Sequence, residues 1–470
     1  MKKNRIYHTL IGDKAFYKSL LAIAVPIMLQ NGLTNLVSLL DNIMVGAVGT
    51  EQMSGVSIVN QLLFVFNLCV FGGLGGAGIY TAQFYGKKDQ QGVQYTFRFK
   101  FMLVLSLLVI GLGVFLLFSE PLIALYLHEG SETGDIAATA MYGAKYMRVM
   151  LWGLLPFAIQ QAYGSTLRET GETMLPMKAG IVAIMVNLVF NYILIFGRFG
   201  APAMGVEGAA LATVISRYVE CFIIVSWTHR HPTRASFIVG AYRTMRVPAA
   251  LVKDIFKRGM PLLVNEALWS AGMAIRVQSF STRGLAMVAA LNISSTISNL
   301  FNVVWMALGV AVSIVIGQQL GANEFEKAKQ SVWRIMAFSF ASAASMGLLM
   351  CAAAPLFPAI YNTTDEVRSI AAGLLRIVGL AAPIHSFCNA SYFTLRSGGK
   401  TWITFLFEAG YLWLISIPLA RILAIGTAWP ILLVFGICEF IDITKALLGF
   451  IMIKKGVWIN NIVADEIGRG

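Results

Sequence analysis

Apolar stretches of roughly 20 or more residues recur along the whole chain, and they constrain its fold more than any other feature. A helix rises about 1.5 Å per residue, so such a stretch can cross the roughly 30 Å hydrocarbon layer of a bilayer. Hydrophobic residues make up 57% of the sequence and charged residues 13%, which excludes an ordinary soluble domain. We therefore expect an all-α, multi-pass membrane protein.

Hydropathy predicts twelve membrane spans. They cover roughly residues 16–46, 52–84, 93–118, 138–166, 176–197, 206–229, 256–281, 286–318, 328–354, 367–395, 402–422 and 428–453. Lys and Arg concentrate in both termini and in the even-numbered connections, which predicts that these segments are cytoplasmic. The net charge of +13 then needs no nucleic acid to explain it, because anionic lipid is the expected neighbour of basic loops.

The two halves of the chain are related in sequence, which predicts two copies of one six-span unit. At a separation of 235 residues the identical pairs are Pro26/Pro261, Leu33/Leu268, Gly49/Gly284, Ile58/Ile293, Phe66/Phe301, Asn67/Asn302, Gln83/Gln318 and Gly86/Gly321. Because six is an even number, both copies cross the membrane in the same sense, as in parallel-repeat transporters. We expect an N-lobe at 1–229, a basic cytoplasmic linker at 230–255 and a C-lobe at 256–470, with a cavity between the lobes.

The first predicted span carries a carboxylate, Asp41, inside an otherwise apolar stretch. An acid within a membrane helix is a functional hypothesis by default, so Asp41 is the first candidate for a coupling site. Asn187 and Asn191 are four residues apart and share a helix face, and Thr213 lies in the next span. With Asp41 they could form a Na⁺ site, or a proton site in which burial favours the neutral acid. The alternative is that both amides only bond neighbouring helices.

Several motifs, taken together and in order, resemble the multidrug and toxic compound extrusion (MATE) transporters of bacteria. They are PIMLQNGLTNLVSLLDNIMVGAVG from residue 26, LVFNYILIFG from 188, GVEGAALAT from 205 and PLLVNEALWS from 261. The resemblance implies twelve helices in two pseudo-symmetric lobes arranged as a V. It also implies alternating access and export of amphipathic, often cationic compounds in exchange for H⁺ or Na⁺.

The same resemblance assigns expectations to individual residues. Asp41, Asn187, Asn191 and Thr213 match the first-lobe cation site, although some members carry a second acid where this chain has Asn191. Glu266 matches the second-lobe acid of the drug and sodium branch. There an aspartate completes the pair, whereas this chain has His385 in or near that position, with Asn389 one turn later.

The substitution by His385 weakens a sodium site, because imidazole is a poor ligand for a hard cation. A Glu266 and His385 pair would suit protons better, since histidine titrates near neutral pH. The alternative is a histidine bonded to backbone inside the bundle.

Arg276 aligns with Asp41 at the 235-residue offset and must find an anion or water. Three interpretations stay open: a pair with Asp41 across the cavity, a contact with an anionic substrate group, or snorkelling or a structural pair. Gln30 and Asn35 in the first span are further cavity candidates, together with Arg276, His385 and Asn389. Pro26 is the candidate hinge.

Two other patterns favour structural interpretations. The spacing of three residues within Arg217/Glu220 and within Glu439/Asp442/Lys445 predicts local helix pairs. The glycine run at 72–78 lacks the Gly-Lys-Ser/Thr ending of a phosphate loop, so it predicts close helix packing.

The sequence thus predicts a monomeric bacterial inner-membrane antiporter for small amphipathic compounds, without a cofactor beyond the coupling ion. Protons are favoured over Na⁺, although a Na⁺ ion at Asp41, Asn187 and Asn191 stays possible. The alternative function is a flippase for lipid or polysaccharide precursors, whose cavity would need several basic groups. An enzyme is not expected, because the histidines and acids form no converging nucleophile, base or metal set.

Overall fold

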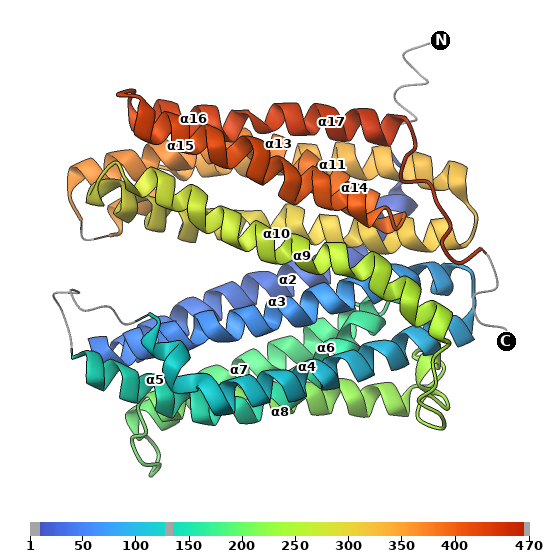
Figure 1. Ribbon diagram of the computed structural model, residues 1–470, viewed down its shortest axis with the longest axis horizontal. Coiled ribbons are helices and arrows are strands. Elements are labelled where there is room, and N and C mark those ends of the chain that lie inside the picture. Colours follow the sequence, from blue (N-terminus) through green and yellow to red (C-terminus); the bar gives the residue numbers. More distant parts are fainter. Residues whose placement is uncertain (1–9, 127–134, 362, 465–470) are drawn as a thin grey trace. The chain divides into compact units, whose positions relative to one another are not determined.

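The computed structural model describes residues 10–126, 135–361 and 363–464. Within these ranges the chain forms helices and turns and contains no strand (Figure 1). This confirms the all-α prediction and follows from the bilayer, in which a helix satisfies its own backbone hydrogen bonds.

The helices of the first half follow the predicted spans. They are α2 (Lys14–Gly46), α3 (Thr50–Gly86), α4 (Gln90–Ala124), α5 (Ile136–Met150), η1 (Leu151–Gly153), α6 (Leu154–Glu169), α7 (Met174–Phe196) and α8 (Val206–Arg230), followed by the short turn η2 (Ser236–Ile238). The fourth predicted span is therefore a helix with a tighter turn, η1, inside it.

The second half repeats this order of long helices. They are α9 (Ala249–Ser281), α10 (Leu285–Gly321), α11 (Phe325–Ala353), α12 (Leu356–Ala359), α13 (Asp365–Ser397), α14 (Thr401–Phe405), η3 (Leu406–Gly410), η4 (Leu412–Ser416), α15 (Ile417–Gly426), α16 (Ile431–Phe440) and α17 (Asp442–Lys454). The segments η3 and η4 are π-helical turns within the eleventh predicted span. The twelfth span is interrupted at Ile441, between α16 and α17.

Nine helices in the described part of the chain are long and apolar enough to cross a membrane. They are α2, α3, α4, α7, α8, α10, α11, α13 and the α14–α15 segment. The other three predicted spans coincide with the interrupted helices α5–α6 and α16–α17 and with the more polar α9. The protein is thus a multi-pass membrane protein, and the count of twelve crossings stays a prediction.

The chain forms two compact units. Unit 1 contains residues 1–28, 82–89 and 253–470, and unit 2 contains residues 29–81 and 90–252. The start of α2 and the end of α3 therefore group with the second half of the sequence. The division within α2 falls between Met28 and Leu29, two residues after the buried Pro26. The predicted lobe boundaries stay a prediction.

Each unit has its own apolar core. In unit 2, α6 contacts both α4 and α8, and α7 packs along α8 (Figure 1). In unit 1, α13 contacts α10, α11, α16 and α17, so it is the central helix of that unit. Residues such as Leu154 in unit 2 and Leu374 in unit 1 are fully buried in these cores.

Small residues let the helices approach closely. In unit 1 a Cβ added at Gly347 of α11 would collide with the carbonyl oxygen of Gly379 in α13. In unit 2 a Cβ at Gly73, in the glycine run, would lie 2.8 Å from Leu103 Cδ2. These contacts agree with close packing at glycines, as membrane helices use it.

We expect Gly347→Ala to lower the free energy of unfolding by about 1–3 kcal/mol, because the added methyl group meets backbone that cannot move aside easily. The measurement is thermal unfolding of the purified protein in detergent. Gly113→Ala in α4 is the matched control, because no atom lies within 4 Å of a Cβ there. An unchanged melting temperature for Gly347→Ala would show that α11 and α13 do not meet at this glycine.

Candidate functional site

Asp41 is held by an amide from another helix of unit 2. The side chain of Asn191, in α7, donates from Nδ2 to Asp41 Oδ1 at 2.6 Å. Asn191 is 1% exposed, and Asp41 is half-buried. A carboxylate at this depth depends on donors from the protein, because lipid offers none.

The amide set continues along α7 and into α8. Asn191 Nδ2 also donates to Asn187 Oδ1 at 3.1 Å, and Asn187 Nδ2 donates to Thr213 Oγ1 at 3.2 Å. The hydroxyl of Thr213 in turn donates to the carbonyl oxygen of Ala209. The four side chains that the polar pattern of the spans and the family resemblance grouped therefore form one hydrogen-bonded chain, which we call the Asp41 cluster (Asp41, Asn187, Asn191, Thr213).

One oxygen of the cluster has no hydrogen-bond partner in the part of the chain that the structure describes. The buried Asn191 Oδ1 accepts no hydrogen bond from any described residue, whereas a buried amide oxygen is normally bonded. Asn187 Oδ1 already accepts from Asn191. The cluster therefore has two places for a small cation or a proton donor: the Asp41 carboxylate and Asn191 Oδ1.

Tyr146 of α5 lies near the cluster and was not predicted. It is buried, lies within electrostatic range of Asp41 and Arg217, and donates to Asn60 Oδ1 at 3.4 Å. No spacing rule connects α5 with α2, so sequence reasoning had no signal for Tyr146. Its hydroxyl extends the polar surroundings of Asp41 toward Arg217 of α8.

The other candidates of the first span lie apart from this hydrogen-bonded chain. Gln30 packs against α7, since a Cβ at Gly180 would lie 3.0 Å from Gln30 Nε2. Asn35 is exposed. Pro26 is buried in α2 and belongs to unit 1.

In unit 1, Glu266 does not pair with His385. The hydroxyl of Tyr392 in α13 donates to Glu266 Oε1 at 3.3 Å, and Arg396 adds an attractive charge nearby. His385 Nε2 instead lies 3.3 Å from Glu439 Oε2 and 3.7 Å from Asp442 Oδ2. The predicted Glu266 and His385 pair is therefore wrong. The turn of α13 that carries Tyr392 contacts α9, whereas the turn that carries His385 contacts α16 and α17.

Arg276 is buried in a salt bridge. Its Nη2 donates to Glu439 Oε1 at 2.6 Å and to the carbonyl oxygen of Cys438 at 3.0 Å. The structure thus bears out a structural pair, the last of the three interpretations. Both of these guanidinium contacts go to α16, within unit 1, and a pair with Asp41 of unit 2 stays a prediction.

The predicted local helix pairs form no salt bridge among the described residues, although Arg217 with Glu220 and Asp442 with Lys445 lie within electrostatic range. Lys445 bonds Glu408 of η3 at 2.7 Å, and Glu439 bonds Arg276 of α9. Glu220 accepts from Gln160 of α6, and Arg217 donates to the carbonyl oxygen of Gly153 in η1. A buried charge without a partner is costly, and in the salt bridges of Glu439 and Lys445 the partner comes from another helix.

Asn389 faces α10. A Cβ at Gly309 would overlap its Oδ1, and this buried oxygen has no hydrogen-bond partner among the described residues. The glycine therefore makes room for the amide. The role of Asn389 as a cavity residue stays a prediction.

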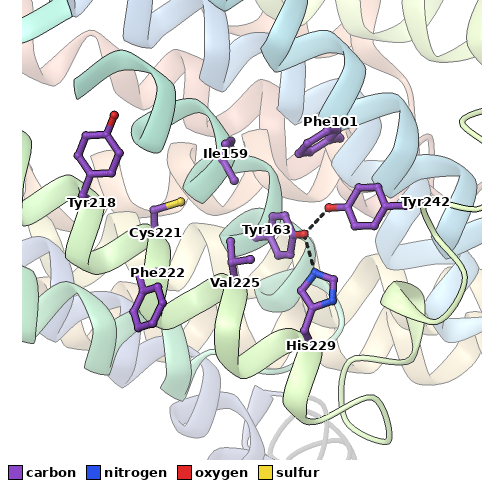
Figure 2. Close-up of a pocket in the computed structure, with 9 residues that line it drawn as sticks. All are labelled: Phe101, Ile159, Tyr163, Tyr218, Cys221, Phe222, Val225, His229 and Tyr242. Carbon is purple, nitrogen blue, oxygen red and sulfur yellow. Dashed lines mark hydrogen bonds between the residues drawn. The ribbon is translucent and has the colours of Figure 1, made fainter. Parts of the chain in front are cut away.

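A separate groove of about 500 Å³ lies on unit 2. Its lining residues, shown in Figure 2, are Phe101, Ile159, Tyr163, Tyr218, Cys221, Phe222, Val225, His229 and Tyr242. The hydroxyl of Tyr163 is bonded to Tyr242 and lies 3.2 Å from His229 Nε2. The groove is mostly apolar and shares no residue with the Asp41 cluster.

The MatE sequence family matches the chain twice, over residues 26–193 and 261–422. Both matched segments begin at a proline of the repeated pair, Pro26 and Pro261. The chain belongs to the MATE family. This agrees with the resemblance of the motifs and with the two six-span copies expected from the sequence.

Curated relatives in the family match nearly the whole chain. The probable multidrug resistance protein YoeA of Bacillus subtilis is 24% identical over 421 residues, which cover 88% of this chain and 89% of that protein. The probable multidrug resistance protein NorM of Thermotoga maritima is 23% identical over 420 residues, which cover 86% of this chain and 85% of that protein.

Solved MATE structures share the fold. One, described as the outward-facing conformation of a multidrug resistance MATE family transporter of the MOP superfamily, superposes with a TM-score of 0.83. The match covers 96% of this chain and 97% of that chain at 20% sequence identity.

We expect Arg276→Met to destabilise this MATE protein by about 3–5 kcal/mol, because Glu439 would remain buried without its guanidinium partner. Adding Glu439→Gln should recover a large part of the loss, since the double variant removes both members of the salt bridge. The measurement is a double-mutant cycle of thermal unfolding in detergent. If the loss in the double variant equals the sum of the losses in Arg276→Met and Glu439→Gln, the two side chains do not form a direct pair.

Proposed function

We propose that the protein is a proton-coupled exporter of small amphipathic, often cationic compounds. The observation that carries the proposal is the Asp41 cluster, in which a membrane-embedded carboxylate is bonded by Asn191. The names of the relatives, multidrug resistance proteins, support the class of substrate. The basic termini and loops support an inner-membrane protein with both ends in the cytoplasm, and we propose that it acts as a monomer.

Protons fit the cluster better than Na⁺. A hard cation takes several oxygen ligands at once. Here the oxygens of Thr213 and Asn187 each already accept one hydrogen bond, so a cation would have to share them with a donor, and only the carboxylate and Asn191 Oδ1 are less committed. A single proton needs only one carboxylate oxygen, and the amides can stay bonded around it.

The coupling cycle follows from the charge on Asp41. When Asp41 is ionised it attracts a cationic compound, and when it is protonated that attraction is lost. A proton that enters along the membrane potential gains about 2.3 kcal/mol per 100 mV, which can bias an equilibrium between two states that bind it differently. The hinge of this cycle is Pro26, a role supported by the division of α2 between the two units just after it.

The flippase alternative receives less support. A pyrophosphate group needs basic side chains that are free to bind it. Arg276 was the main candidate, and its guanidinium already bonds Glu439 and Cys438.

We expect Asp41→Asn to reduce proton-driven ethidium efflux from reconstituted vesicles to the level of empty vesicles, because asparagine cannot gain and lose a proton. Glu120→Gln, at an exposed position near the end of α4, is the matched loss of one acid and should keep the wild-type rate. Wild-type efflux by Asp41→Asn would remove Asp41 from the mechanism.

A further inference from the structure

The ends of α3 and α10 cross at two glycines of unit 1. Gly86 and Gly321 occupy equivalent positions in the two sequence repeats. A Cβ at Gly86 would overlap the carbonyl of Gln318, and a Cβ at Gly321 would overlap the carbonyl of Gln83. Backbone therefore lies against backbone, and helix ends from both repeats are joined at this crossing.

The segment that follows α17, residues 457–464, is bound across this crossing, and we call it the C-terminal strap. It is not a loose tail: Trp458 is 1% exposed and Val463 is fully buried. Trp458 donates from Nε1 to the carbonyl oxygen of Ile453, and its own carbonyl touches Gly398, where a Cβ would not fit.

Gln83, near the end of α3, is the centre of the attachment. It is fully buried, and its Nε2 donates to the carbonyl oxygens of Ser397 at 2.9 Å and Asn460 at 3.3 Å. Its Oε1 accepts from the backbone N–H of Ile462 at 2.9 Å. One turn later, Lys87 Nζ donates to the carbonyl oxygen of Val463 at 2.6 Å.

The strap also holds the ends of α10 and α13. Asn461 Nδ2 donates to Asn323 Oδ1 at 2.7 Å and lies 3.4 Å from the carbonyl oxygen of Gly321. Asn460 Nδ2 donates to the carbonyl oxygen of Gly398 at 3.2 Å. A single short segment thus bonds one helix end from the first repeat and two from the second.

We infer that the C-terminal strap is a latch that keeps the ends of α3 and α10 together in one state of the transport cycle and releases them in another. This inference rests on the proposed function, because an exporter that alternates its access must separate helix ends on one side of the membrane. Basic loops and termini predict that this side is the cytoplasm. Apart from the Lys87 ammonium, the bonded groups are neutral amides and backbone. A neutral hydrogen bond is modest in net free energy, so the attachment can open without a large cost.

The test compares two glutamine-to-methionine variants. Gln83→Met keeps the volume and removes three hydrogen bonds to the strap and to α13. Gln90→Met at the start of α4 is the control, because Gln90 bonds the carbonyl oxygen of Ser236 in another loop. Spin labels go on cysteines introduced at the exposed Lys88 and Ala322, in a protein whose five native cysteines are replaced by alanine.

Double electron–electron resonance then measures the distance between the two labels in lipid nanodiscs, without drug or gradient. We expect Gln83→Met to raise the ratio of separated to joined ends by at least about fivefold, the effect of one net hydrogen bond. Gln90→Met should leave the ratio unchanged. A distance distribution for Gln83→Met that matches the wild type would overturn the latch.

Asn461→Ala provides a second, milder variant. It removes the bonds of the strap to Asn323 and to the carbonyl oxygen of Gly321 at the end of α10, and it keeps the bonds of Gln83. It should shift the same ratio in the same direction, and no shift would contradict a strap that joins the two ends. Because the distance is measured without transport, the latch can fail while Asp41 still drives export. Conversely, loss of proton coupling would leave the distances unaffected.

Discussion

A bilayer cannot solvate a charged or polar side chain, and this constraint accounts for most of the specific contacts in the structure. Buried charges in the described part of the chain pair across helices: Lys100 bonds Glu169, and Lys445 bonds Glu408. Such pairs contribute little net stability, but a lone member would be costly. Asp41 differs from them, since its bonded partner is the neutral amide of Asn191. Glu220 and Glu266 also accept from neutral groups, but each has an arginine within electrostatic range. On the proposed mechanism, Asp41 is therefore an acid whose charge the protein leaves open to exchange.

The two repeats use one position in opposite ways. Asp41 and Arg276 are equivalent at the 235-residue offset, yet each bonds within its own unit. The arginine is fixed by Glu439, whereas the aspartate is bonded by an amide. On the proposed mechanism, duplication supplied the scaffold, and divergence left an exchangeable acid in one half and a structural ion pair in the other.

The sequence predicted the helical class and the approximate spans, because hydropathy is a local signal. It also named Asp41 as an acid inside a span and paired Asn187 with Asn191 by their spacing of four, and the family resemblance joined these residues and Thr213 into one site. It failed for Glu266 with His385 and for the supposed pairs around Glu439 and Lys445. Those partners depend on which turns of α9, α13, α16 and α17 face one another, and no local spacing encodes that. Tyr146 beside Asp41, and the strap residues beside Gln83, were missed for the same reason.

The most direct test of a proton-exchanging Asp41 is ethidium transport by proteoliposomes under one imposed gradient at a time. We predict accumulation driven by a pH gradient at equal Na⁺, and none driven by a Na⁺ gradient at uniform pH. Transport that follows the Na⁺ gradient and ignores the pH gradient would contradict proton exchange, because a metal ion would then occupy the cluster in place of the proton.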